Sequence, residues 1–154
     1  MIGPARGNIL SRRYNMVNKI KVVTAKIGLD DHYRGVIAVT EALRDAGMEV
    51  VYLGTGQRIE GVIKAVIQED TDVLGLSFLC GGHLEAMRRV MNRMKEENLD
   101  HVVVVIGGVI PPGDVPKLEE MGVAGVFLPG IPLKDIANFL AHEVEKRARR
   151  SATL

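Results

Sequence analysis

Short, nearly continuous apolar runs alternate along the chain with longer segments in which apolar residues recur every three or four positions. The short runs are rich in Val, Ile and Leu, which is typical of parallel strands buried on both faces. The longer segments have the spacing of amphipathic helices, and Gly47 stands where the first of them should stop. We predict strands over residues 20–25, 49–53, 73–77, 101–106 and 125–128, and helices over residues 33–46, 58–69, 83–97, 115–121 and 134–147.

This alternation predicts an α/β fold, with a doubly wound five-stranded parallel sheet of the Rossmann-like or flavodoxin-like kind. Right-handed crossovers make 2-1-3-4-5 the common strand order, and we adopt it as an assumption. In that order the loops after strands 1, 3 and 4 open side by side at the carboxyl edge of the sheet. Open α/β sheets bind ligands at this edge, so we expect the functional residues in these loops.

The length of 154 residues and a hydrophobic fraction of 47% fit one ordinary domain. We place this domain at residues 19–147, after a flexible N-terminal arm over residues 1–18 that contains scattered Gly, Pro and Arg. Residues 148–154 are expected to form a C-terminal tail. The basic cluster near that tail, Lys146 to Arg150, is interpreted as the solvated end of a helix.

Charge and cysteine content exclude several classes of partner and location. A formal net charge of +1 gives no general attraction to nucleic acid or to an anionic membrane, so we expect neither partner. No apolar run approaches the roughly 20 residues that span a bilayer, and the start of the chain lacks the apolar region of a secretory signal. The single cysteine, Cys80, suits a reducing compartment, and we expect a cytoplasmic protein.

The loop after the first strand carries the chain's most distinctive chemistry, in residues 26–35. Asp30 could accept a hydrogen bond from one ring nitrogen of His32, which would fix the tautomer and leave the other nitrogen free to bind a metal. Gly35 would allow the close approach of a backbone or a large ligand. By themselves these residues do not distinguish a metal ligand from an exposed histidine.

The loops after strands 3 and 4 are rich in small residues, over residues 77–83 and 107–112. Paired glycines and a serine hydroxyl leave space for something long and bulky against the sheet. No phosphate-binding fingerprint is present, because there is no G-x-x-x-x-G-K-[ST]. Cys80 is expected to be a buried, unreactive thiol. His83 is expected to start a helix rather than to bind a metal.

Three separated motifs on these loops resemble one known family. They are D-x-H-x-x-G at Asp30, His32 and Gly35, S-x-L at Ser77 and Leu79 followed by His83, and G-G at Gly107 and Gly108. In this order they resemble the cobalamin-binding domain of the adenosylcobalamin-dependent acyl-CoA mutases, of the methylmalonyl-CoA mutase type. The resemblance covers residues 19–144.

The resemblance implies specific roles for the motif residues. His32 matches the histidine that replaces the cofactor's own benzimidazole as the lower axial ligand of cobalt, and Asp30 and Lys26 match its supporting partners. Ser77 would bond the base of the displaced nucleotide tail. The cofactor-binding set implied by the family is Asp30, His32, Arg34, Gly35, Ser77, Leu79, Gly107, Gly108, Phe127 and Gly130.

The last of the expected cofactor loops departs from the family pattern. Where these mutases usually show F-G-P-G-T, this chain has Leu128 in place of the glycine and Ile131 in place of the threonine. Contacts from this loop to the nucleotide tail are therefore the weakest part of the expected site.

The family also implies a division of labour between two chains. Its reaction, a radical 1,2-rearrangement of the carbon skeleton, takes place in a TIM-barrel domain that binds acyl-CoA, and such a barrel needs roughly 250 residues. We expect an isomerase subunit that holds adenosylcobalamin, is inactive alone and works with a separate large subunit. A corrinoid carrier of a methyltransferase system, a non-catalytic cobalamin-binding regulatory module and a receiver-like domain without cofactor stay open as alternatives.

Overall fold

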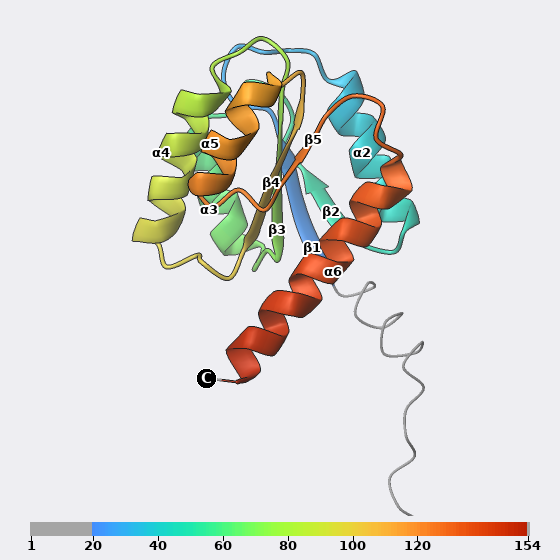
Figure 1. The fold of residues 1–154 in the computed structure, drawn as a ribbon, viewed down its shortest axis with the longest axis vertical. Helices are drawn as coiled ribbons and strands as arrows, with labels where there is room; N and C mark the ends of the chain where they lie inside the picture. Colours follow the sequence, from blue (N-terminus) through green and yellow to red (C-terminus); the bar gives the residue numbers. More distant parts are fainter. Residues whose placement is uncertain (1–19, 154) are drawn as a thin grey trace, which may run out of the picture.

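The computed structural model describes residues 20–153 and contains one five-stranded sheet in the order β2-β1-β3-β4-β5, with every pair parallel. Figure 1 shows helices on both faces of this sheet. The strands are β1 (Lys21–Ala25), β2 (Glu49–Tyr52), β3 (Val73–Phe78), β4 (Val103–Gly108) and β5 (Gly125–Phe127). The helices are α2 (Arg34–Asp45), α3 (Ile59–Gln68), α4 (His83–Glu96), the 3₁₀ turn η1 (Pro112–Asp114), α5 (Val115–Glu120) and α6 (Leu133–Ala152). The predicted fold class and strand order are confirmed.

Two apolar layers hold the helices to the sheet. Side chains of α3, α4 and α5 pack on one face, with Val62, Met87 and Leu118 fully buried. Side chains of α2 and α6 pack on the other face, where Leu43 and Leu140 meet the strands. The second layer is the smaller of the two, and the candidate site described below opens within it.

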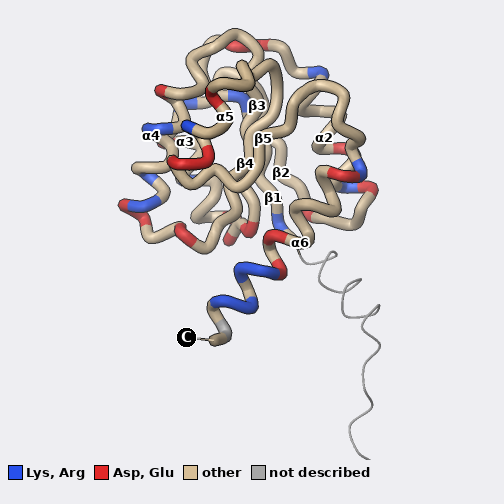
Figure 2. The backbone as a smooth tube through the Cα atoms, in the orientation of Figure 1, with Lys and Arg blue, Asp and Glu red and all other residues tan. Residues whose placement is uncertain are grey.

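Three predicted boundaries are wrong by two residues or more, and these are the two ends of β4, which begins at Val103 rather than at residue 101, and the end of α6. The strand β4 continues through Gly107 and Gly108, which the sequence placed in a loop, because these residues pair with Ser77 and Phe78 of β3. The helix α6 continues past residue 147 to Ala152, since Ala and Arg favour a helix there and Arg149 pairs with Glu145 one turn earlier. The basic cluster therefore lies on this helical end (Figure 2). The predicted N-terminal arm lies outside the described residues.

Gly108 occupies a position that no other residue can fill without movement. Its φ is +118°, and a Cβ built there would lie 1.8 Å from the carbonyl oxygen of Phe78. The following residue, Val109, donates its N–H to that same oxygen at 3.0 Å. The chain thus crosses directly over the end of β3 as it leaves the sheet.

Replacing Gly108 by alanine should lower the free energy of unfolding by about 2 kcal/mol or more, because the residue is strained and the end of β3 must shift. Urea denaturation measures this change. Gly113→Ala is the matched control, because its φ is not positive and nothing lies within 4 Å of the added Cβ. Equal stability of the two variants would contradict the close approach of β4 to β3.

Candidate functional site

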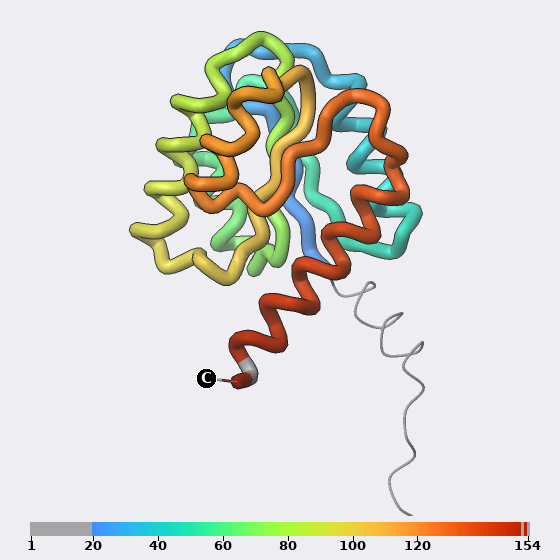
Figure 3. Tube along the Cα trace, viewed as in Figure 1, coloured from blue at the N-terminus to red at the C-terminus, as the bar shows by residue number. Residues whose placement is uncertain are grey.

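The loops that follow β1, β3, β4 and β5 gather at one end of the sheet, as the trace in Figure 3 shows. The β1–α2 loop is held there by backbone hydrogen bonds to the loop after β2. Lys26 donates its N–H to Gly54 O at 3.1 Å, and Gln57 donates to Lys26 O at 3.0 Å. These bonds fix the start of the loop that carries Asp30 and His32.

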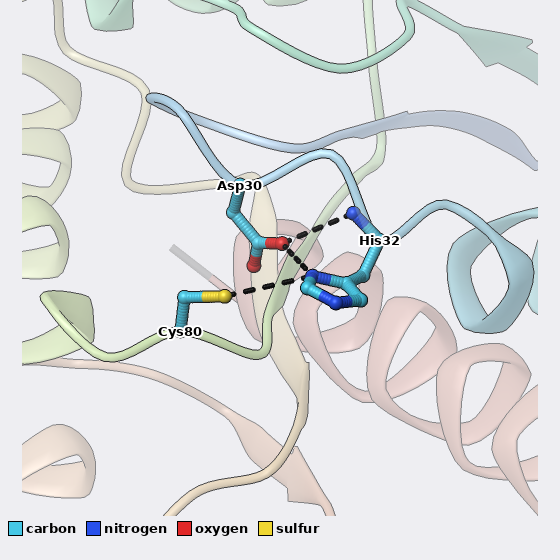
Figure 4. Close-up of side chains that lie close together, drawn as sticks. All are labelled: Asp30, His32 and Cys80. Atoms are coloured by element: carbon cyan, nitrogen blue, oxygen red, sulfur yellow. Dashed lines mark hydrogen bonds and ion pairs between the residues drawn. The ribbon is translucent and has the colours of Figure 1, made fainter.

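The carboxylate of Asp30 is the centre of a hydrogen-bond network at this end. Its Oδ1 accepts the backbone N–H of His32 at 3.1 Å and lies 3.0 Å from Nδ1 of the same ring (Figure 4). Its Oδ2 accepts the N–H of Leu79 at 2.7 Å and lies 3.0 Å from Nζ of Lys26. Burial alone would raise the pKa of Asp30, but the bonds from Leu79, Lys26 and His32 together hold that pKa well below its usual range. Asp30 is therefore a fixed anionic acceptor.

Lys26 is completely buried and reaches across to the end of β3. Besides Asp30, its Nζ donates to the carbonyl oxygen of Ser77 at 3.1 Å and to Ser77 Oγ at 3.2 Å. A buried ammonium group needs such partners, because an unpaired buried charge is strongly destabilising. Of the two residues expected to support His32, Asp30 bonds the ring, and Lys26 pairs with Asp30. The bond to the Ser77 hydroxyl was not foreseen from the sequence.

The imidazole of His32 stands at the rim of this network, with 56% of its side chain exposed. Because Asp30 is an obligate acceptor, Nδ1 carries the ring hydrogen and Nε2 keeps its lone pair. Among the described residues, Nε2 has no hydrogen-bond partner. The ring therefore offers one oriented nitrogen donor to an incoming ligand.

The thiol of Cys80 lies beside the same ring, with Sγ 3.5 Å from His32 Nδ1 (Figure 4). The prediction that Cys80 is buried is wrong, because its side chain is exposed. The reason is the turn that follows it: Gly81 and Gly82 both adopt left-handed backbone angles, with φ of +81° and +72°. This turn lifts the loop above the sheet instead of letting Cys80 enter the core.

A cavity of about 640 Å³ opens beside His32 and runs between the sheet and the helices α2 and α6. Most of its lining is apolar. It brings together nine of the residues expected from the sequence, and these are His32, Arg34, Gly35, Ser77, Leu79, Gly107, Gly108, Phe127 and Gly130. Lys26 and Asp30 lie behind the lining and support it. The Phe127–Gly130 loop therefore borders the cavity despite its departure from the family pattern.

Sequence reasoning missed the deeper residues of this cavity, among them Thr24, Val39, Gly75 and Ile136. Thr24 and Val39 look like ordinary core positions in a strand and a helix. Gly75 did carry a signal, because a glycine inside a strand often marks a close approach to the backbone. A Cβ at Gly75 would make only ordinary contacts with Thr24 and Val105, so no close backbone approach requires a glycine there.

Thr24, on the floor of the cavity, pairs its hydroxyl with that of Thr40, which does not line the cavity. Thr24 Oγ1 and Thr40 Oγ1 are 2.8 Å apart and both residues are buried. Their mutual hydrogen bond satisfies part of their polarity, so the floor behaves as a largely apolar surface. A mostly apolar cavity with an oriented imidazole beside it fits a metal-containing ligand that also buries a largely apolar group.

His83 ties together two loops that flank the cavity. It starts α4, as predicted, and its Nε2 lies 2.9 Å from Oδ2 of Asp114, in the turn after β4. The contact from His83, together with Lys117, lowers the pKa of Asp114. This pair links the β3–α4 loop, which carries Leu79, to the loop that follows Gly108.

Fold and site together define an open parallel α/β domain that binds a ligand at its topological switch point. A model of the B12 binding domain matches residues 20–134. This match covers most of the chain, which therefore belongs to the B12-binding-domain family. The predicted resemblance is confirmed, and a receiver-like domain is no longer a candidate.

Two relatives and one solved structure give the context. The chain is 40% identical over 131 residues to the 2-hydroxyisobutanoyl-CoA mutase small subunit of Aquincola tertiaricarbonis. The aligned residues make up 85% of this chain and 96% of that protein. It is 43% identical over 117 residues to the pivalyl-CoA mutase small subunit of Xanthobacter autotrophicus. Here the aligned residues make up 76% of this chain and 78% of that protein. A cobalamin-binding protein from Desulfitobacterium hafniense shares the fold, with a TM-score of 0.71 and 24% identity over 82% of this chain and 60% of that chain.

Proposed function

We propose that this chain is the cobalamin-binding small subunit of an adenosylcobalamin-dependent acyl-CoA mutase, an isomerase. The observation that carries the proposal is the Asp30–His32 hydrogen bond of 3.0 Å at the mouth of the apolar cavity. It sets the tautomer that a histidine needs to ligate a metal through Nε2. Similarity across almost the full length of a mutase small subunit favours this assignment over a methyltransferase carrier or a regulatory module.

In this proposal His32 is the lower axial ligand of cobalt, in place of the cofactor's benzimidazole. Asp30 holds the ring in position by accepting the Nδ1 hydrogen, and Lys26 holds Asp30. Asp30 and Lys26 are positioning residues, since neither borders the cavity. Such outer hydrogen-bond partners orient a ligand and raise its basicity.

The displaced nucleotide tail would occupy the cavity. Ser77 Oγ already accepts a hydrogen bond from Lys26, which leaves its own hydrogen free to donate to a nitrogen of the base. Gly35 provides room at the start of α2, and Gly107 lines the cavity where β4 runs close to Phe127 of β5. Arg34, Leu79, Gly108, Phe127 and Gly130 complete the expected contacts around the tail.

The bound cofactor would supply the radical chemistry of a 1,2-rearrangement of the acyl-CoA carbon skeleton. The acyl-CoA itself would bind to a separate large subunit with a TIM barrel. Exposed apolar side chains support such a partner, because Leu29, Tyr33 and Val109 are each more than half exposed in loops around the cavity mouth. The single cysteine supports a cytoplasmic location. No helix in the described part of the chain has the length and apolar character to cross a bilayer.

Electron paramagnetic resonance of the cob(II)alamin complex tests the axial assignment. In protein labelled with ¹⁵N-histidine, the nitrogen hyperfine splitting should change from that of the unlabelled complex, because a protein nitrogen replaces the benzimidazole nitrogen on cobalt. Labelled His142→Ala protein should give the same altered splitting, since His142 lies on α6, outside the cavity lining. A splitting that does not respond to the label would refute His32 as the cobalt ligand.

A further inference from the structure

The side chains of Asp30, His32 and Cys80 form a cluster of three different metal-ligating groups. Their ligand atoms all lie within 4.8 Å of one another. Asp30 Oδ1 is 3.0 Å from His32 Nδ1, and Cys80 Sγ is 3.5 Å from the same nitrogen. The cluster involves the ring nitrogen that the proposed cobalt bond does not use, and it includes a thiol that has no role in the proposed function.

The two separations from His32 Nδ1 are close to two edges of a tetrahedral zinc site, and the third lies within 4.8 Å. With Zn–N and Zn–O bonds near 2.0 Å and Zn–S bonds near 2.3 Å, neighbouring ligand atoms stand roughly 3.3 to 3.6 Å apart. The observed separations of 3.0 and 3.5 Å need only small side-chain movements to reach that range. His32 and Cys80 are both exposed, so a fourth position is open to water.

The charges around the cluster select the kind of cation. Lys26 binds Oδ2 of Asp30 and offsets its charge, while Oδ1 remains available. A hard cation such as Mg²⁺ would meet a carboxylate that Lys26 already neutralises, while the next carboxylate, of the exposed Asp31, lies 4.0 Å from His32 Nδ1 and outside the cluster. A thiophilic cation gains the Cys80 thiolate as well as the imidazole. The thiol then releases its proton to solvent, and the ring hydrogen moves from Nδ1 to Nε2.

We infer that Asp30, His32 and Cys80 form a site for a thiophilic divalent cation, such as Zn²⁺, in the chain before cobalamin is loaded. A neutral imidazole has one nitrogen lone pair, so a ring bound to zinc through Nδ1 cannot bind cobalt through Nε2. Zinc therefore blocks the loading of cobalamin. This second statement rests on the proposed function, whereas the zinc site itself does not.

Zinc binding by the metal-free, cobalamin-free chain is measured by competition with a chromophoric chelator. The wild-type chain should bind one Zn²⁺, and Mg²⁺ should not compete. Cys80→Ser and His32→Ala should each weaken binding by more than the roughly 10- to 100-fold loss that follows removal of an outer hydrogen-bond partner. His142→Ala, on α6, is the control and should bind as the wild type does. With Cd²⁺ in place of Zn²⁺, thiolate-to-metal ultraviolet absorption should appear in the wild type and be absent from Cys80→Ser.

The blocking effect is measured by adding cobalamin to zinc-loaded chains. Zinc should weaken cobalamin binding by the wild-type chain, and it should have little effect on Cys80→Ala. If the wild-type chain bound no zinc, or if the wild type and Cys80→Ser bound zinc equally well, the proposed zinc site would be wrong. If zinc did not change the cobalamin affinity of the wild-type chain, the inference that zinc blocks cobalamin loading would be wrong. The zinc titration uses no cobalamin, so a chain that bound no cobalamin would count against the proposed function alone.

Discussion

Replacing His32 by alanine should leave the protein folded but lower the mutase turnover of the reconstituted complex by more than about 100-fold, beyond the usual effect of an outer-partner change. The fold should survive because the side chain is 56% exposed and contributes little to the core. The proposed cobalt ligand, by contrast, is lost completely. Turnover with a large subunit and urea denaturation measure the two effects separately.

Replacing Asp30 by asparagine should have a different pair of effects. Turnover should fall by only roughly 10- to 100-fold, since the ring keeps its nitrogen but loses its anionic partner. Stability should fall by about 3 kcal/mol, because the buried ammonium group of Lys26 loses its counter-charge. Asp45→Asn is the matched control, since Asp45 is exposed at the end of α2 and does not line the cavity, and it should change neither quantity.

The contrast between these variants is what distinguishes a ligand from a positioning residue. If Asp30→Asn reduced turnover as far as His32→Ala, the carboxylate would have to act directly on cobalt or substrate. If His32→Ala unfolded the protein, the ring would be part of the core after all. Either result would contradict the roles assigned to the two residues.

The isolated chain should show no mutase activity, and a large subunit should bind it more tightly when adenosylcobalamin is present. The apolar rim of the cavity is exposed, so it would leave the face of a bound cofactor uncovered, and radical chemistry must be shielded from water. The coupling should lie within the usual 5- to 150-fold range, and the large subunit should strengthen cofactor binding by the same factor. Calorimetric titrations with and without cofactor measure both directions. Equal affinities of the chain for the large subunit with and without cofactor would show that the two binding steps are not coupled. Mutase turnover by the isolated chain would contradict its role as a subunit.

The docking face can be tested within the same experiment. Leu29 is fully exposed in the β1–α2 loop, and Leu29→Asp should weaken the large-subunit complex without changing cobalamin affinity. Ile67 on α3 is also exposed but lies on a helix that does not border the cavity. Ile67→Asp should therefore bind the large subunit normally. If the two variants weakened the complex equally, the proposal that the large subunit binds at the cavity mouth would be contradicted.

The sequence predicted the fold and the Asp30–His32 pair for a definite physical reason. Strands buried on both faces are readable as apolar runs, and a parallel sheet brings the loops at their carboxyl ends together. His32 and Asp30 are neighbours along the chain, so their hydrogen bond is a local property. Lys26 and Asp30 are likewise one short loop apart.

What escaped prediction depends on contacts between distant segments or on backbone angles. Two consecutive glycines, Gly107 and Gly108, are typical of a loop. Only their pairing with β3 makes them part of a strand. The exposure of Cys80 follows from two consecutive left-handed glycines, which no periodicity shows. Thr24 and Gly75 line the cavity together with residues of α2 and α6, so their exposure to it depends on how these helices pack on the sheet.

The burial of Lys26 constrains how this chain can change over evolutionary time. A descendant that gave up cobalamin could lose His32 freely, because the ring lies at the surface. It could not lose Asp30 alone, since a fully buried ammonium group would then face no carboxylate. Positions 26 and 30 should therefore be exchanged together, and a lineage without the cofactor would be recognised by an intact Lys–Asp pair beside a missing histidine.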